Sequence, residues 1–315
     1  MAVATLVGLT AQAQAQPAEG KARAVTVTVL STMLTDAQGI GEWGFAAVVE
    51  VDGYRLLFDT GNRPETVLRN AEELKVDLAS VEDVVLSHNH GDHAGGLSTL
   101  RRTLGVKSPK ALSRVHVGRG IFETRRSEGG DRDNSMSAIR QAYEAGGGKV
   151  IEDSGPERLA PAVWLTGPVT RRYPERNWSG GVRILTAEGE VEDTIPEDMS
   201  LVVDARDGLV IVTGCGHAGI GNIMAQTREM FPGTPVRAVV GGLHLLNASE
   251  ESLAWTADRM REAGVKYLLG AHCTGIEAVY RLRVLAGLDR KTAVVGAVGS
   301  SYSSATGIDP LRLAR

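Results

Sequence analysis

Four side chains able to bind a metal ion lie within six residues of this chain: His88, His90, Asp92 and His93. They follow a short apolar run at 84–86 that predicts a buried strand. In an extended segment, residues two apart point the same way, so His88 and His90 can converge on one ion. Asp92 and His93 begin the next helix and can turn toward a second ion. Neutral imidazoles with a carboxylate favour Zn²⁺, with iron or manganese as alternatives.

Three further histidines also follow apolar runs, in the glycine-rich phrases GCGHAG, GGLHL and AHCTG: His217, His244 and His272. Glycine lets the chain turn sharply where a strand ends, and such a turn can present a ligand. His116 differs because it lies inside the run VHVG, and we predict a structural or rim position for it.

Around these histidines the sequence resembles a known family. HNHGDH matches the H-x-H-x-D-H motif of the metallo-β-lactamase superfamily, and Leu57–Gly61 (LFDTG) resembles that superfamily's earlier strand-end motif. The phrases TGCGHAG, GGLHL and HCTG resemble a narrower branch, the dihydropteroate-synthase-related or dihydropterin-aminobenzene-phosphate-synthase-like metal hydrolases. The resemblance covers nearly the whole chain after Val25.

The resemblance implies roles for single residues. His217 would complete the first ion's set with His88 and His90, and His272 would join Asp92 and His93 at the second. Asp92 would also be catalytic, by orienting the nucleophile. Asp59 would support the ligand loop without binding metal. His244 is expected to contact substrate, with a ligand role as the alternative.

One departure from the family pattern concerns Cys215, which stands where many members place a bridging aspartate. Cys215 is either a soft ligand or a small buried residue, and Asp198 is a weaker candidate carboxylate. We interpret Cys273 as a packing residue, although the two thiols can pair in an oxidising compartment. The sequence therefore leaves open whether one or two ions bind.

The elements that would position these residues alternate between strands and helices. β-branched and apolar runs predict strands at 25–30, 45–51, 54–58, 84–86, 114–117, 201–203, 209–213, 236–240, 267–270 and 294–298. Helices are expected after residues 64, 136, 220 and 249, and between the last strands. This order predicts an α/β (α+β) fold, the four-layer αββα sandwich. Residues 23–315 would form one domain with an insertion at about 119–180.

That predicted insertion is rich in arginine: Arg119, Arg125, Arg126, Arg132, Arg171, Arg172 and Arg176. Two interpretations stay open. The arginines form a solvated charged surface among acidic residues, or a lid that offers guanidinium groups to an anionic substrate.

Composition sets limits on the function. The net charge is −4, which argues against a strongly basic nucleic-acid binder, and two cysteines exclude a disulfide scaffold. Residues 1–22 combine a short apolar run with A-x-A spacing, so they are either a signal peptide or a disordered tail. A signal peptide would make the protein periplasmic or secreted, and a disordered tail would leave it cytoplasmic. No segment is long enough to span a membrane.

We therefore expect a zinc-dependent hydrolase that uses a metal-bound hydroxide on a small ester, lactone, lactam or phosphoester. Two alternatives are kept. One is a metal-dependent ligand-binding or sensor protein without turnover, and the other is a phosphodiesterase or nuclease. We expect a small-molecule substrate and no nucleic-acid partner, and the sequence leaves the oligomeric state open.

Overall fold

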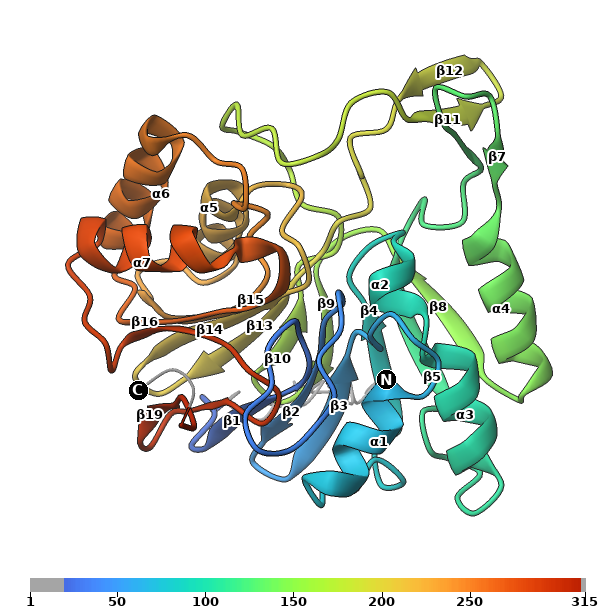
Figure 1. Cartoon of the computed structure of the whole chain (residues 1–315), viewed down its shortest axis with the longest axis horizontal. Coiled ribbons are helices and arrows are strands. Elements are labelled where there is room, and N and C mark those ends of the chain that lie inside the picture. Colours follow the sequence, from blue (N-terminus) through green and yellow to red (C-terminus); the bar gives the residue numbers. More distant parts are fainter. Residues whose placement is uncertain (1–19, 313–315) are drawn as a thin grey trace, which may run out of the picture.

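The computed structural model describes residues 20–312, and two large β-sheets lie at its centre (Figure 1). The first sheet has eight strands in the order β19-β18-β1-β2-β3-β4-β5-β8. Its strands are β1 (Val25–Ser31), β2 (Ala46–Val51), β3 (Tyr54–Phe58), β4 (Asp83–Leu86), β5 (Arg114–Gly118), β8 (Lys149–Asp153), β18 (Ser301–Ser303) and β19 (Gly307–Asp309).

The second sheet has seven strands in the order β17-β16-β15-β14-β13-β10-β9. Its strands are β9 (Glu157–Ala160), β10 (Val163–Leu165), β13 (Leu201–Ala205), β14 (Gly208–Thr213), β15 (Val236–Gly241), β16 (Tyr267–Gly270) and β17 (Ala293–Val295). A small third sheet, β12-β11-β6-β7, projects from the body in Figure 1. It consists of β6 (Arg125–Arg126), β7 (Arg132–Asp133), β11 (Arg183–Thr186) and β12 (Gly189–Glu192).

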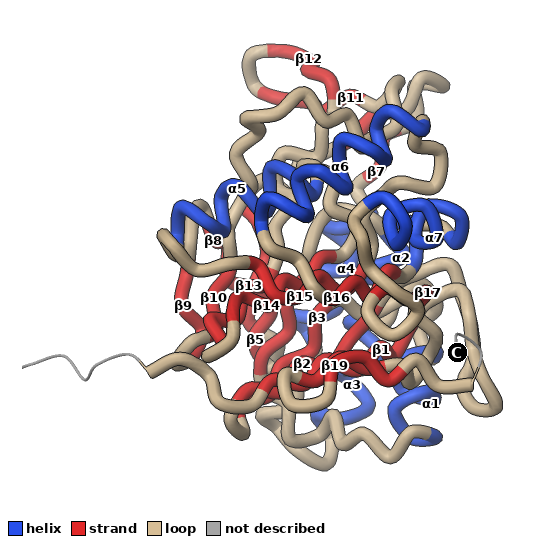
Figure 2. Tube along the Cα trace, turned by 90° about the vertical axis from the view of Figure 1, so that its left-hand side faces the viewer, coloured by secondary structure: helices blue, strands red, loops and turns tan. Residues whose placement is uncertain are grey.

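Helices cover the outer face of each large sheet. Against the first sheet lie α1 (Thr66–Glu73), α2 (Gly91–Ala94), α3 (Leu97–Gly105) and α4 (Ser135–Ala145). Against the second lie α5 (Ile220–Met230), α6 (Glu250–Ala263) and α7 (Ile276–Leu285). A single turn of 3₁₀-helix spans His272–Thr274. Figure 2 shows the strands between α5 and α6 on one side and α1 and α3 on the other.

Period-two alternation in the strands explains this layering. Along β1, Val25, Val27 and Val29 face the cluster between the two sheets, whereas Leu30 faces the cluster under the first group of helices. A strand with both faces covered by apolar layers is stable only inside such a stack. The αββα sandwich predicted from the sequence is confirmed.

Short sequence features explain two local structures. Asp52 (φ 48°) and Gly53 (φ 95°) make the two-residue turn between β2 and β3, where both central residues need positive φ. Ser249 caps α6 by accepting a hydrogen bond from the Ser252 backbone N–H at 3.2 Å, and Gly264 ends the helix in the left-handed conformation.

The predicted insertion at 119–180 is distributed over several parts of the fold. β8 lies at the edge of the first sheet, β9 and β10 extend the second, and β6 and β7 belong to the third. This stretch therefore contributes outer strands to both main sheets. The proposed signal or tail covers 1–22, of which 1–19 lie outside the described residues, and Ala22 is already buried and pairs with Ala205. Within residues 20–312, no helix is long and apolar enough to cross a membrane.

Candidate metal centre

The six predicted ligands follow strands of both large sheets and meet at one edge. β3 and β4 run parallel, and so do β14, β15 and β16, so the loops at their carboxyl ends lie together. The structure brings the ligands into two groups, His88 with His90 and His217, and Asp92 with His93 and His272. Within each group the ligand atoms lie within 4.8 Å of one another.

The first group contains three imidazoles. His88 Nε2 lies 2.9 Å from His90 Nδ1, and the His217 ring centroid lies 4.6 Å from that of His88 and 4.9 Å from that of His90. Burial lowers the pKa of His88 and of His217 well below the ordinary value, and it lowers the pKa of His90 to about 4. The rings are therefore neutral at pH 7, which is the form that binds metal.

Neighbouring groups fix the orientation of these rings. The Asp59 carboxylate accepts hydrogen bonds from the Ser87 backbone N–H and hydroxyl, both at 2.8 Å. Because its proton goes to Asp59, the Ser87 hydroxyl accepts from His88 Nδ1 at 2.8 Å, and His88 Nε2 keeps its lone pair. His217 Nδ1 donates to the Asn177 carbonyl oxygen in the same way.

The second group places a carboxylate between two imidazoles. Asp92 Oδ2 lies 3.2 Å from His272 Nε2, and Asp92 Oδ1 lies 3.9 Å from His93 Nε2. Burial alone would raise the pKa of Asp92, but the imidazoles of His272 and His93 outweigh burial and lower it. His93 Nδ1 lies 2.7 Å from Asp59 Oδ2. Burial alone would lower the pKa of His93, but Asp59 raises it to about 9, so a cation here must displace a proton.

Unsatisfied nitrogens test whether a metal ion fits. His217 Nε2 and His272 Nδ1 are buried and lack a hydrogen-bond partner among residues 20–312, and His272 Nε2 contacts the Asp92 carboxylate at 3.2 Å without hydrogen-bond geometry. A buried polar atom without a partner costs about 1–3 kcal/mol, so native proteins rarely leave several at one place. A divalent cation would satisfy the one lone pair that each neutral ring offers, and the mixed imidazole and carboxylate set suits it. We conclude that the residues present fit a metal site.

Backbone strain accompanies the strand ends of this site. Asp59 (φ 56°), His244 (φ 49°) and His272 (φ 47°) all adopt the left-handed conformation that favours glycine. Each such residue costs of order 1 kcal/mol or more and persists where the surroundings fix it, often at functional sites. At each of these three strand ends the sequence retains a side chain that reaches the cluster.

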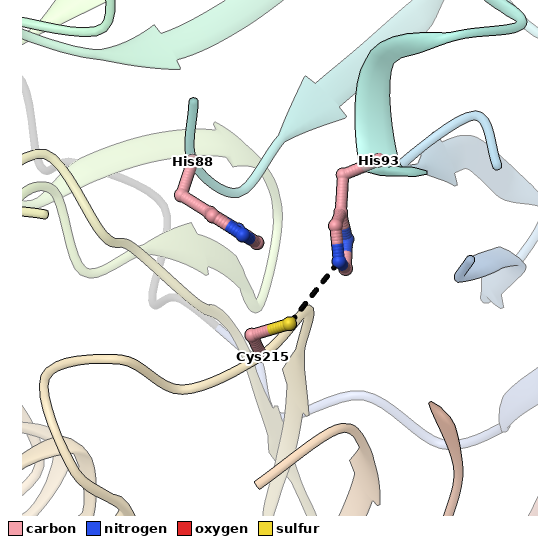
Figure 3. Close-up of side chains that lie close together, drawn as sticks. All are labelled: His88, His93 and Cys215. Carbon is pink, nitrogen blue, oxygen red and sulfur yellow. Dashed lines mark hydrogen bonds between the residues drawn. The ribbon is translucent and has the colours of Figure 1, made fainter. Parts of the chain in front are cut away.

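The structure also places the residues whose roles the sequence left open. The His244 ring lies 4.5 Å from the His217 ring, half-buried at the border of the cluster. Asp198 is buried and accepts a hydrogen bond from the Ala218 backbone N–H at 2.8 Å, and it belongs to none of the donor groups found among residues 20–312. Figure 3 shows Cys215 pointing toward His93 and His88, with its Sγ 3.2 Å from His93 Nε2.

Several residues that position the ligands were not predicted from the sequence. Glu197 is fully buried and forms an ion pair with the Arg125 guanidinium at 2.8 Å. It also accepts a hydrogen bond from the Asn89 backbone N–H at 3.0 Å, and so helps to fix the loop that carries His88 and His90. Arg125 in turn donates to three backbone carbonyls of 120–123. Asn177 acts through its backbone, so its side-chain type carries no signal. Ser87 precedes His88 directly, and that position was the available clue.

The arginines of 119–180 are mostly occupied by protein partners. Arg126, Arg172 and Arg176 form ion pairs with glutamates. Arg171 lies over the Trp178 ring at 5.0 Å and donates to the His217 carbonyl oxygen at 3.2 Å. These contacts favour the interpretation as a paired charged surface for most of the set. Arg119 and Arg132 are exposed, and Arg132 lines a pocket beside the cluster.

That pocket has a volume of about 310 Å³ and adjoins the first donor group. His90 and Asn89 form one wall, and Arg132 and Asp133 of the third sheet form another. On the second group's side, the Trp43 ring lies 4.8 Å from the His272 ring and is 45% exposed. His90 is therefore the ligand that lines this pocket, whereas His88, His93, His217 and His272 are buried.

Comparisons with known proteins agree with this architecture. A family model described as the metallo-beta-lactamase superfamily matches residues 44–191. The chain is 28% identical over 242 residues to 7,8-dihydropterin-6-methyl-4-(beta-D-ribofuranosyl)-aminobenzene-5'-phosphate synthase of Methanocaldococcus jannaschii, covering 75% of this chain and 82% of the relative.

Two solved structures extend the comparison. Tm1679, described as a metal-dependent hydrolase of the beta-lactamase superfamily, has a TM-score of 0.67 at 28% identity, covering 82% of this chain and 92% of that one. YhfI from Bacillus subtilis, a metallo-beta-lactamase fold protein, has a TM-score of 0.56 at 13% identity, covering 90% and 100%, and this similarity concerns the fold. The layered sheets, the donor groups at their edge and these similarities agree with the resemblance to the metallo-β-lactamase superfamily that the sequence motifs carry.

Proposed function

We propose that this protein is a zinc-dependent hydrolase of a small ester, lactone, lactam or phosphoester. The observation that carries the proposal is the pair of adjoining donor groups, His88 with His90 and His217, and Asp92 with His93 and His272, beside an open pocket. Two ions a few ångström apart can act on one reacting centre, whereas a buried structural site would be closed to substrate.

The chain's own residues would divide the work. Zinc bound at these donors supplies Lewis acidity, which lowers the pKa of a coordinated water toward neutrality. Asp92 is ionised and lies between His93 and His272, so its carboxylate is placed to orient the water and take its proton. Asp59 holds His93 and the Ser87 loop in position, and His244 at the border is placed to contact substrate.

The pocket favours a small substrate over a nucleic acid. Its charged lining mixes Arg132 with Asp131 and Asp133, and Arg125 is already paired with Asp193 and Glu197. Such a lining does not form the continuous basic track that binds a phosphate backbone. We therefore place the phosphodiesterase or nuclease alternative behind hydrolysis of a small molecule.

A turnover screen tests the proposal. Metal-replete protein would be assayed on chromogenic lactam, lactone, carboxylester and phosphodiester substrates, with Asp92→Asn as the inactive control. We expect hydrolysis of at least one class, abolished in Asp92→Asn. Tight ligand binding with no hydrolysis of any class would refute the hydrolase proposal and favour the sensor alternative.

The curated relative supports a second candidate, because its name describes a synthase that forms a pterin–aminobenzene phosphate compound. The similarity to it spans 75% of this chain, which is the observation in favour. The same screen, extended with a dihydropterin phosphate and an aminobenzene ribofuranosyl phosphate, separates the candidates. Condensation of that pair without hydrolysis of the chromogenic substrates would select the synthase.

A further inference from the structure

The chain's two cysteines lie side by side next to the histidines. Cys215 follows β14 and Cys273 follows β16, and their Sγ atoms are 3.2 Å apart. Each side chain is 2% exposed, yet neither belongs to the three apolar clusters formed by the described residues. Packing in a hydrophobic core, which the sequence suggested for Cys273 and left as one of two roles for Cys215, therefore does not explain their position.

Nitrogen donors surround the two sulfurs. Cys215 Sγ lies 3.2 Å from His93 Nε2, and Cys215, Cys273 and His272 form a group whose ligand atoms lie within 4.8 Å of one another. Donor atoms that share one tetrahedral ion at bond lengths of about 2.0–2.3 Å are separated by about 3.3–3.8 Å. The 3.2 Å contacts are within a few tenths of an ångström of that spacing. His272 Nδ1 also lacks a hydrogen-bond partner within 20–312, whereas His272 Nε2 lies 3.2 Å from Asp92 Oδ2.

The loop at 241–246 joins the two cysteine loops, because it bonds to the Cys273 loop and its Gly242 backbone N–H donates to the Gly214 carbonyl oxygen at 3.0 Å. The Cys273 carbonyl oxygen accepts hydrogen bonds from the backbone N–H groups of Leu245 and Leu246, at 3.1 and 3.2 Å. The Thr274 hydroxyl accepts from the Leu243 N–H and donates to the Gly241 carbonyl oxygen. A Cβ atom at Gly242 would lie 2.9 Å from Cys273 Sγ and 2.2 Å from the Gly214 carbonyl oxygen, so glycine is what allows this approach. The thiols are thus held near one another by the loops that carry them.

We propose that Cys215 and Cys273, together with His272, form a thiolate-containing site for a thiophilic divalent ion such as zinc, cobalt or cadmium. Each thiol that coordinates the ion releases its proton to solvent. The proposal rests on the proposed function in one respect, because His272 would be shared with the second donor group. Sulfur donors favour thiophilic ions over magnesium or calcium, so the site would make this part of the centre selective.

Cobalt spectroscopy tests the proposal without an activity measurement. The full-length protein would be reduced, stripped of metal and titrated anaerobically with Co²⁺. Because the chain has two cysteines, a sulfur-to-cobalt charge-transfer band in the near ultraviolet can come from these two residues alone. We expect the band in the unaltered protein and its loss in Cys215→Ser, with a weakened band in Cys273→Ser. Ser200→Ala, a buried change of one oxygen atom whose hydroxyl has no partner among the described residues, should retain it.

The outcomes separate this proposal from the hydrolase proposal. Visible cobalt bands from a nitrogen and oxygen environment with no charge-transfer band would overturn the thiolate site and leave the histidine centre standing. Absence of both kinds of band at saturating Co²⁺ would overturn both. The spectrum of the unaltered protein decides the question even if a cysteine variant fails to fold.

Discussion

Asp59 contacts both ends of the segment 87–93, which carries four of the six proposed ligands, so its replacement by asparagine should affect folding and metal binding together. Asp59 is 0% exposed and accepts three hydrogen bonds, from the Ser87 N–H, the Ser87 hydroxyl and His93 Nδ1. An asparagine oxygen can keep the first of these bonds. Its amide NH₂ would then face the Ser87 hydroxyl and the His93 N–H, two groups that need an acceptor.

The size of the effect follows from these contacts. A hydrogen bond to a charged group is worth about 1.5–3 kcal/mol, and breaking a buried ion pair costs about 3–5 kcal/mol. We therefore expect Asp59→Asn to lower the free energy of unfolding of the metal-free protein by about 3–5 kcal/mol. At about 2–4 °C per kcal/mol for a domain of this size, Tm should fall by at least about 6 °C. Zinc affinity should fall about 10- to 100-fold, because a ligand loses its oriented partner.

Thermal unfolding of the metal-free protein and zinc titration of the folded protein measure the two effects separately. Asp207→Asn is the matched control, because Asp207 forms a solvent-exposed ion pair with Arg237 and exposed pairs contribute about 0–1 kcal/mol. If Asp59→Asn lowers Tm no more than Asp207→Asn and leaves zinc affinity within about twofold, Asp59 does not hold the segment 87–93 in place and this reasoning is wrong.

Three further predictions concern metal content, pH dependence and close packing. Purified protein should contain one to two transition-metal equivalents by elemental analysis, fewer in His88→Ala and His217→Ala; unchanged content in both would refute the ligand assignment. His116 lies 3.4 Å from Asp83 and from Asp153. Burial alone would lower its pKa, but these carboxylates raise it to about 9, above the ordinary 6.5. Its stabilising effect, up to about 3 kcal/mol, should be complete below about pH 6.5 and be lost as pH rises through about 9. Urea unfolding across that range should show a smaller decline in His116→Gln, and an equal decline would contradict it. A Cβ at Gly95 would lie 1.8 Å from the Asn62 carbonyl oxygen, whereas a Cβ at Gly91 meets no atom within 4 Å. Gly95→Ala should therefore cost about 1–3 kcal/mol in chemical denaturation and Gly91→Ala about 0.5 kcal/mol or less; equal costs would show that the backbone adjusts.

The layers could be predicted from the sequence, because a strand covered on both faces is apolar at successive positions. Its alternate residues then pack into two different cores. β3 and α5 lie at the residues that the pattern indicated. β18 and β19 were missed, since SYS and GID are short and gain their stability at the sheet edge, where β18 pairs with β1 and β19 pairs with β18. Their register is a tertiary property without a local signal.

The candidate site was predictable where ligands follow strands at recognisable spacing, and less so where partners act from a distance. The Asn177 carbonyl that orients His217 could belong to any residue type. Glu197 looks like a surface glutamate in the sequence, and its burial depends on an ion pair with Arg125, which lies 72 positions earlier in the chain. Whether Cys215 packs or binds could not be settled from sequence either, since the decisive neighbour, Cys273, comes from another strand end.

Neither donor group is complete within one sheet. His88 and His90 come from the first sheet and His217 from the second, and Asp92 and His93 need His272 across the same junction. An ion bound there would act as a cross-link between the two halves of the chain. By mass action it would lower the free energy of the states in which the sheets are joined by RT ln(1 + [M]/Kd), where [M] is the free metal concentration. Metal loss and separation of the sheets would then be coupled, so a chelator should hasten unfolding even though it touches no core residue.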